Sequence, residues 1–326
     1  MNGTPKKQHY VPQVLLRNFA FGKNEQVHVY DKQTRRTWKA AVRDVASENY
    51  FYDWDSGDGT KTVEDYLGTV ETAAGPVIEK ILQLDSLALS EGEQAIMSAF
   101  LAVQMTRTRA AKERLVALSS LLIDRLGGEK LAPDIEHFLE ALKDQNALNE
   151  QFSGMVRQSV DDYSAHFLNK GWMLVSTSTE DPFYIGDSPV ALQNRNKREG
   201  PWSNLGLAVE GIEIHFPLST TRGLTLLCPT HVANIKRAGE QRDFFMRFAP
   251  SRLKALKDEA GVGCIAKALN EGALMPMDAS NVRNFNSLQV AFAERFVFSA
   301  TPDFALVAEM LDNTSSNKRG PKWTPT

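Results

Sequence analysis

The chain has 326 residues, of which 42% are apolar and 24% charged, and its formal net charge is −3. These values are those of a folded globular protein and exclude a disordered or collagen-like chain. Two cysteines, Cys228 and Cys264, are too few for a disulfide framework, so a reducing compartment is expected. The basic N-terminus has no signal-peptide core, and no segment reaches the roughly 18 apolar residues of a membrane helix. A cytoplasmic protein without membrane contact is therefore expected.

The small net charge conceals two oppositely charged segments. Residues 1–40, called the basic arm below, hold eight Lys or Arg against two acidic residues, a net charge of +6. Residues 48–93 hold eleven acidic residues against two Lys, a net charge of −9. Two explanations are open. The segments form separate solvated faces or neutralise each other, or the arm meets an anion while the acids hold a metal.

The first 60 residues predict short elements. Gln13 to Phe19 fits a short helix that follows the extended His9-Tyr-Val-Pro12 segment. Polar and apolar residues alternate in 26–30 and again in 36–40, which predicts a small β-hairpin. A short extended segment over 47–52 and a turn-rich loop over 53–60 follow.

The next 110 residues predict long helices. A helix capped by Thr62 runs to about Leu84, with a possible kink at Pro76. The capping-box pattern of Ser90 and Glu93 opens a helix from 91 to about 126, with a bend expected at 106–108 and an end at Gly127. Two further helices are predicted over 133–143 and 149–169.

The remainder is richer in strands. Strands are predicted over 172–177, 182–185, 211–216, 224–228 and 295–299, a polar loop over 193–206, and helices over 229–248, 252–260 and 281–294. The fold class is therefore α+β, with a block of long helices, a mixed or antiparallel sheet and the N-terminal hairpin. We expect one domain over 1–312, with a possible sub-division near 170, and a disordered tail over 313–326.

Several motifs carry a resemblance to a known family. The opening Lys7-Gln-His-Tyr-Val-Pro-Gln-Val-Leu-Leu-Arg-Asn-Phe19 resembles the signature of the bacterial family called domain of unknown function 4238. Weaker motifs follow in the expected order, such as Glu48-Asn-Tyr-Phe-Tyr52, Gln104-Met-Thr-Arg-Thr-Arg109 and Phe183-Tyr-Ile-Gly-Asp-Ser-Pro-Val190. One departure is Gly186, where members more often have Ser or Thr. The resemblance spans roughly residues 5 to 300 and implies a shared fold, but the family name states no activity.

The basic arm offers one candidate site. His9 is a possible general base or ligand, because the ordinary pKa of histidine, about 6.5, suits both roles. Its neighbours Lys6, Lys7 and Arg17 suit an anionic ligand. Alternatively, the apolar residues around His9 anchor the arm and the imidazole only makes a hydrogen bond.

Three carboxylates form a candidate metal set. Glu64 and Glu71 are seven residues apart on one predicted helix and therefore share a face, and Glu48 lies just upstream. Together with His9 they could hold Mg²⁺ or Mn²⁺. The alternative is that these acids lie at the surface or pair with Arg107 and Arg109.

Two further candidates are polar groups in predicted elements. Gln104 and Arg107 fall on one face of the long helix, where they need polar partners if buried. Arg107 could contact a phosphate, or it could join a buried network with Glu64 or Glu71. Asp187 follows a predicted strand, which is a frequent place for a catalytic carboxylate but also for an ordinary Asp-Ser-Pro turn.

Two functions are compatible with these residues. The first is a metal-dependent hydrolase, such as a nuclease of a defence or mobile-element system, that acts on nucleic acid or another phosphate-bearing ligand. The second is a non-catalytic module of a multi-gene system that binds a nucleotide or a protein partner from the same operon. The chain has no dinucleotide fingerprint, no P-loop, no Gly-x-Ser-x-Gly elbow and no zinc-ligand cysteine spacing.

Overall fold

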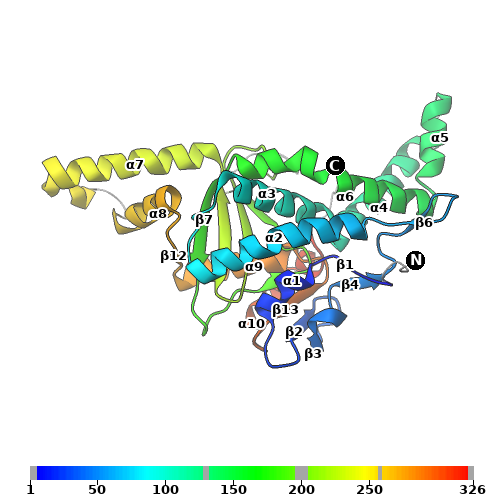
Figure 1. The fold of residues 1–326 in the computed structure, drawn as a ribbon, viewed down its shortest axis with the longest axis horizontal. Coiled ribbons are helices and arrows are strands. Elements are labelled where there is room, and N and C mark those ends of the chain that lie inside the picture. The colour runs from blue at the N-terminus through cyan, green and yellow to red at the C-terminus, as the bar shows by residue number, and fades with distance from the viewer. Residues whose placement is uncertain (1–5, 128–131, 195–204, 256–258, 322–326) are drawn as a thin grey trace.

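Two β-sheets and a block of long helices make up the fold, as seen in the computed structural model (Figure 1). The structure describes residues 6–127, 132–194, 205–255 and 259–321. The larger sheet has the order β12-β7-β11-β10-β9, and only the β12–β7 pair within it is parallel. Its strands are β7 (Gly171–Ser176), β9 (Ala191–Asn194), β10 (Ile212–Pro217), β11 (Arg222–Leu227) and β12 (Met275–Pro276).

The smaller sheet is antiparallel and has the order β3-β2-β13-β8. Its strands are β2 (Gln26–Asp31), β3 (Thr37–Ala41), β8 (Ile185–Gly186) and β13 (Phe296–Ser299). The β2–β3 pair is the predicted N-terminal hairpin. Two further pairs join β1 (Lys7–His9) to β4 (Ser47–Asn49) and β5 (Trp54–Asp55) to β6 (Thr60–Lys61).

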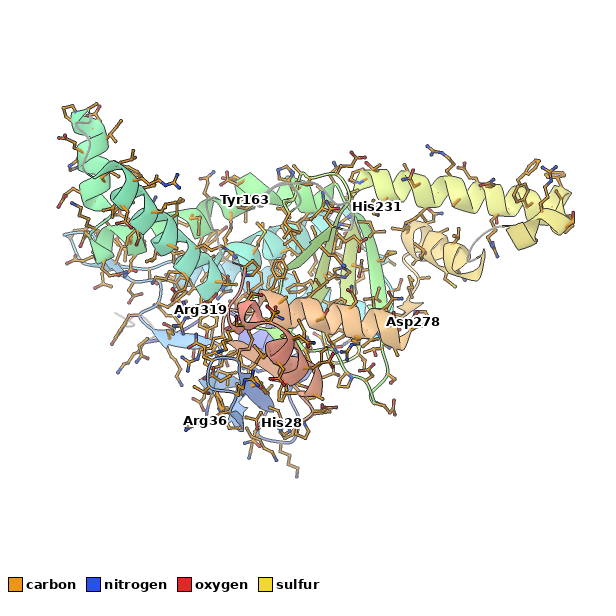
Figure 2. All side chains as sticks on the ribbon, turned by 180° about the vertical axis from the view of Figure 1, so that it is seen from behind. His28, Arg36, Tyr163, His231, Asp278 and Arg319 are labelled. Carbon is orange, nitrogen blue, oxygen red and sulfur yellow. The ribbon has the colours of Figure 1, made fainter. Side chains whose placement is uncertain are left out.

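Ten α-helices are described. They are α1 (Gln13–Leu16), α2 (Glu64–Leu84), α3 (Glu91–Thr106), α4 (Arg109–Leu126), α5 (Pro133–Ala141), α6 (Gln145–Leu168), α7 (Pro229–Phe248), α8 (Glu259–Glu271), α9 (Ala279–Phe292) and α10 (Ala305–Asn313). Short 3₁₀ helices are η1 (Arg17–Phe19), η2 (Val42–Asp44), η3 (Pro250–Ala255) and η4 (Ser315–Lys318). Helices α5 and α7 project from opposite ends of the protein (Figures 1 and 2). None of the described helices combines the length and the apolar character that crossing a membrane would require. The helices and sheets together confirm the predicted α+β fold class.

Local capping signals place the long helices. Ser90 and Glu93 form the predicted capping box at the start of α3. The predicted bend is a break between α3 and α4, where Thr108 is extended and its hydroxyl accepts the backbone N–H of Ala111. Helix α2 begins at Glu64 with Val63 as its N-cap, later than predicted, and the Thr62 hydroxyl accepts the Gln8 amide and the Glu64 N–H, each at 3.4 Å.

Helices cover both faces of the larger sheet. Phe216 and His215 are neighbours in β10, so their side chains point to opposite faces. On one face the Phe100 ring of α3 meets Phe216 at 6.1 Å, and on the other Phe285 of α9 meets His215 at 5.4 Å. A glycine at 223 in β11 is required there, because a Cβ would lie 2.8 Å from the Phe285 ring. One continuous cluster of buried apolar side chains includes residues on both sides of position 170.

The C-terminal region differs from the expectation of a disordered tail. Residues 315–318 form η4 after α10, and the backbone N–H of the buried Gly320 donates to the Glu294 carboxylate at 3.1 Å. These contacts involve residues distant in the sequence, so composition alone does not reveal them. Residues 322–326 lie outside the described residues. The start of the predicted polar loop, Gln193 and Asn194, belongs to strand β9, and positions 195–204 of that loop are also outside the description.

Candidate functional site

The family-like N-terminal motif enters the fold as strand β1. Gln8 is fully buried, and its side chain accepts the backbone N–H of Tyr52 at 2.6 Å and donates to Asp53. Beyond the strand, the backbone N–H of Tyr10 donates to the Ala46 carbonyl at 2.9 Å. The motif is therefore held against residues 46–53 by main-chain and amide contacts.

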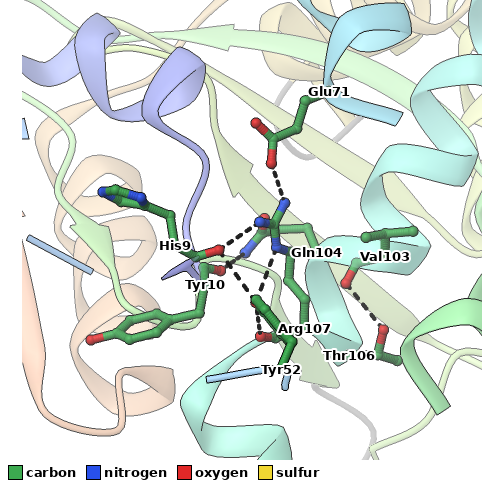
Figure 3. A network of polar contacts seen from close by, with 8 residues as sticks. All are labelled: His9, Tyr10, Tyr52, Glu71, Val103, Gln104, Thr106 and Arg107. Carbon is green, nitrogen blue, oxygen red and sulfur yellow. Dashed lines mark hydrogen bonds and ion pairs between the residues drawn. The ribbon is translucent and has the colours of Figure 1, made fainter. Parts of the chain in front are cut away.

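Arg107 lies directly beneath this strand, and only 2% of its surface is exposed. Its guanidinium donates to the His9 carbonyl at 2.6 Å and to the Glu71 carboxylate at 2.6 Å (Figure 3). The Tyr52 hydroxyl donates to the Arg107 carbonyl at 2.8 Å. Although burial disfavours the charge of Arg107, the neighbouring Tyr52 and Glu71 raise the pKa of the guanidinium above its ordinary value. Arg107 is thus a charged, fully engaged link between β1 and α2.

Gln104 adds a second contact to the same segment. Its side chain is fully buried one helical turn before Arg107 and donates to the Tyr10 carbonyl at 3.0 Å. The other side-chain atom, Oε1, is buried without a hydrogen-bond partner among the described residues. Gln104 and Arg107 therefore hold two successive carbonyl groups of the motif (Figure 3).

The imidazole of His9 points away from this network, whereas its carbonyl points into it (Figure 3). Burial lowers the pKa of His9, and the charge of Arg107 lowers it further while Glu71 opposes the shift. The ring atom Nε2 is buried and has no hydrogen-bond partner among the described residues. His9 thus has a neutral ring near pH 7, and its contact with Arg107 is made by its backbone.

Glu64 lies in the first turn of α2, and the charges of Arg107 and Glu71 affect the pKa of its carboxyl. Burial raises the pKa of its carboxyl to about 7, Arg107 opposes the shift, and Glu71 and Asp53 add to it. Its Oε1 atom is buried and has no hydrogen-bond partner in the described part of the chain. Glu64 is therefore partly protonated near neutral pH.

Glu48, the third predicted metal ligand, takes another partner. Its carboxylate lies 3.3 Å from the Arg109 guanidinium, beyond the Arg107 network. Within the described residues, no group of three or more His, Cys, Asp or Glu side chains is arranged to hold a metal ion. The structure thus brings Glu64 and Glu71 near Arg107 but gives Glu48 a separate ion pair.

Arg17 lies in η1 on the outer side of the motif. It pairs with Glu25 at 3.1 Å and donates to Gln13 at 3.3 Å. Together with Glu71 it lines an open groove of about 790 Å³ between α1–η1 and α2. We call this the α1–α2 groove; its walls include Val14, Asn18, Gly68, Thr72, Gly75 and Leu82. Glu71 is the residue that connects this groove to the buried Arg107.

Asp187 belongs to a different set of contacts. Its fully buried carboxylate accepts three backbone N–H groups, from Glu294 at 2.6 Å, Arg295 at 2.9 Å and Phe296 at 2.8 Å. Burial raises the pKa of Asp187, and these hydrogen bonds and Lys32 oppose the shift. Asp187 therefore fixes the turn between α9 and β13.

Sequence reasoning gave no role to three residues of these networks. Tyr52 ends a family-like motif and Gln8 lies inside another, so their motifs were a usable signal. Lys32 gave no signal, because a lysine after a strand is expected in water. Its side chain is fully buried and donates to the Val290 carbonyl at 2.6 Å and also to that of Ala293.

Comparison with known proteins gives one match. The family model described as "Protein of unknown function (DUF4238)" matches residues 7–303. The match begins at β1 and includes every residue of the networks around Arg107 and Asp187. Comparisons with curated proteins and with solved structures give no match.

Proposed function

Because the chain belongs to the DUF4238 family, whose description names no activity, we propose its function from the geometry: it is a non-catalytic module that binds a protein partner in the α1–α2 groove. Its groove has the size of a ligand-binding site. The buried network beneath the groove supports the wall on which Glu71 lies. The following observations support this proposal over a hydrolase.

The main support for the proposal is that Arg107 and Asp187 are already engaged by groups of the protein itself. Arg107 donates to the His9 carbonyl and to Glu71, and Asp187 accepts three N–H groups of the backbone. Both side chains are buried, at 2% and 0% exposed. Neither side chain therefore offers a free face to a phosphate or to a metal-bound water, as phosphodiester hydrolysis requires.

The lining of the groove favours a peptide as its occupant. Gly68 and Gly75 are two helical turns apart on one face of α2, and a Cβ at position 68 would meet no atom within 4 Å. A partner backbone can approach closely there, as in helix-in-groove recognition. Among the charged residues of the wall, Arg17 pairs with Glu25 and Glu71 with Arg107, whereas Glu79 makes no ion pair with a described residue. The Glu79 carboxylate repels a phosphate and attracts Lys or Arg, so we propose a partner segment with apolar side chains and a basic residue.

One observation favours the hydrolase as the second candidate. A carboxyl with a pKa of about 7, as in Glu64, suits a general acid near neutral pH. However, Oε1 of Glu64 is buried, and Glu64 is not among the residues that line the groove. The binding module thus explains the open surface, whereas the hydrolase would need Glu64 to become accessible.

Site-specific photo-crosslinking of the full chain in its host cells tests the binding proposal. A photoreactive residue at Thr72, in the groove, should give one discrete crosslinked protein, and the same group at Gly154, on α6, should not. Gly68→Leu should abolish the crosslink by filling the groove. A partner captured equally from both positions, or captured despite Gly68→Leu, would contradict the groove as the binding surface.

A cleavage assay tests the second candidate. We expect purified protein to leave single- and double-stranded DNA and RNA intact with Mg²⁺ or Mn²⁺. Divalent-dependent cleavage by the wild type that is lost in Glu64→Gln would establish the hydrolase instead.

A further inference from the structure

A second cavity, of about 290 Å³, lies among α3, α4 and α6 and shares no lining residue with the α1–α2 groove. We call it the Arg114 cavity. Its apolar wall consists of Met105, Ala111, Leu115, Leu118 and Met155. At roughly 30 Å³ per water molecule, the volume equals that of about ten waters. A ligand of about ten non-hydrogen atoms fits this space.

Arg114 is the one charged residue among the described residues that line the cavity. In the described part of the chain it makes no hydrogen bond and no ion pair. Burial lowers the pKa of its guanidinium, and the charge of Glu294 opposes this shift. The Glu294 carboxylate already accepts the Gly320 N–H and lies 3.9 Å from Arg319. Arg114 is therefore a cation without an ion-pair partner among the described residues.

Tyr163, on α6, contributes a second polar group to the wall (Figure 2). Its hydroxyl makes no hydrogen bond to the described residues. The other hydroxyl in the wall, that of Thr106, is engaged with the Ala102 and Val103 carbonyls of its own helix. The cavity thus offers a guanidinium and a phenol as donors, set in an apolar wall.

We propose that the Arg114 cavity binds a small carboxylic acid with an apolar body. The carboxylate would accept hydrogen bonds from Arg114 and Tyr163, and the body would lie against the Met and Leu side chains. A guanidinium matches the two oxygens of a carboxylate and is the side chain best suited to such a pair. A mostly apolar pocket with few convergent polar groups is the usual form of a small-molecule site.

Isothermal titration of the full chain with octanoate, which has ten non-hydrogen atoms, tests this site. We expect saturable binding with one equivalent, and weaker binding of the neutral octanamide and of acetate, which lack the charge and the apolar body respectively. Arg114→Gln should weaken octanoate binding by about tenfold or more, because a charge-assisted contact is lost. Tyr163→Phe should weaken it by a smaller factor.

Two variants serve as controls. Arg125→Gln removes an exposed arginine of the same helix, and Gly68→Leu fills the separate groove, so both should bind octanoate as the wild type does. Circular dichroism establishes that each variant is folded. Equal affinity for octanoate and octanamide would overturn the proposal. A loss of octanoate affinity in Arg125→Gln as large as that in Arg114→Gln would also overturn it.

Discussion

Arg107 shows how one side chain can connect three segments. It contacts the carbonyl of His9 in β1 and the carboxylate of Glu71 in α2, and its own carbonyl accepts from Tyr52. A buried charge is stable only while its donors are paired, because it has lost its contact with water. The two guanidinium contacts therefore depend on each other, and losing the guanidinium removes the donor of the His9 carbonyl and of the Glu71 carboxylate.

We predict that Arg107→Gln lowers the free energy of unfolding by about 3 kcal/mol, because it leaves a buried carbonyl and a carboxylate without a partner. Arg109→Gln is the matched control. Arg109 pairs with the partly exposed Glu48 and Glu113, and such pairs contribute less than about 1 kcal/mol. Urea denaturation measures both values. Equal losses in the two variants would show that Arg107 is not a structural link.

The raised pKa of the Glu64 carboxyl predicts that the stability of the protein depends on pH. Burial raises the pKa of its carboxyl to about 7 in the folded protein, above its value in the unfolded chain. The folded state then binds more protons between about pH 4.5 and 7, so the contribution of Glu64 to stability falls as pH rises through this window. Glu64→Gln should remove this fall, so the stability difference between variant and wild type should grow in favour of the variant from pH 4.5 to 8.

Glu79→Gln is the control for Glu64→Gln, because Glu79 lies on the same helix, is exposed and is not among the groups whose charges shift the pKa of Glu64. Its effect on the free energy of unfolding should stay constant between pH 5 and 8. Urea denaturation at several pH values gives both differences. A constant difference for Glu64→Gln as well would contradict the burial of its carboxyl.

The sequence identified part of this network. Gln104 and Arg107 share a helix face and need partners, which predicted either a ligand site or a buried network with Glu64 or Glu71 as an alternative. The structure contains the contact between Arg107 and Glu71. The role of the His9 carbonyl could not be predicted, because every residue has a carbonyl and only the fold selects which one meets a guanidinium.

At the scale of elements, the break between α3 and α4 determines where Arg107 lies. Arg107 is the C-cap of α3. Thr108 is extended and is the N-cap of α4, and its hydroxyl accepts the Ala111 N–H at 3.3 Å. A side-chain oxygen at this position accepts a hydrogen bond from one of the first N–H groups of α4, which have no partner within the helix. Arg107 thus faces β1 from the end of one helix.

We predict that Thr108→Val lowers the free energy of unfolding by about 1 kcal/mol, because valine keeps the shape but removes the cap. Thr106→Val, two residues earlier, should cost less. The Thr106 hydroxyl donates only to carbonyls of α3 itself, whose helical hydrogen bonds remain. Thermal denaturation compares the two variants. A smaller loss for Thr108→Val than for Thr106→Val would contradict the capping role.

Elements with local signals were the ones predicted well. The capping box at Ser90, the break near Thr108 and the end of α4 at Gly127 all follow from residues within one turn. Strand β9 and the region of η4 were not predicted, because contacts with residues distant in the sequence determine their structure. β9 is placed by its pairing with β10, and Gly320 by its contact with Glu294.

At the scale of the molecule, no ion pair joins the two charged segments within the part of the chain that the structure describes. Among the described residues, Asp58 and Glu93 pair with Lys61 and Lys80 of the same acidic segment, and three other acids of 48–93 pair with arginines further along the chain. These pairs are Glu48–Arg109, Glu71–Arg107 and Asp85–Arg222. The basic residues of the arm pair with Glu25, Asp44 and Asp312 instead, and the buried Lys32 donates to two carbonyls. The acidic segment thus helps to join the N-terminal region to the helices and the larger sheet.

The continuous core predicts one cooperative unfolding transition. Buried side chains on both sides of position 170 belong to a single apolar cluster, so neither part can unfold without exposing the other. Calorimetry should give equal calorimetric and van't Hoff enthalpies. Two separated transitions would indicate the alternative, a division into two domains near residue 170.

The central claim is that the protein binds a partner in the α1–α2 groove and that the network beneath is a scaffold. The most direct measurement is the affinity of the partner crosslinked at Thr72 for the wild type, Gly68→Leu and Gly154→Leu. Both variants replace an exposed helical glycine whose Cβ position is open, but only position 68 lines the groove. We predict binding at least about tenfold weaker for Gly68→Leu and unchanged for Gly154→Leu. Equal affinities for all three proteins would contradict the claim.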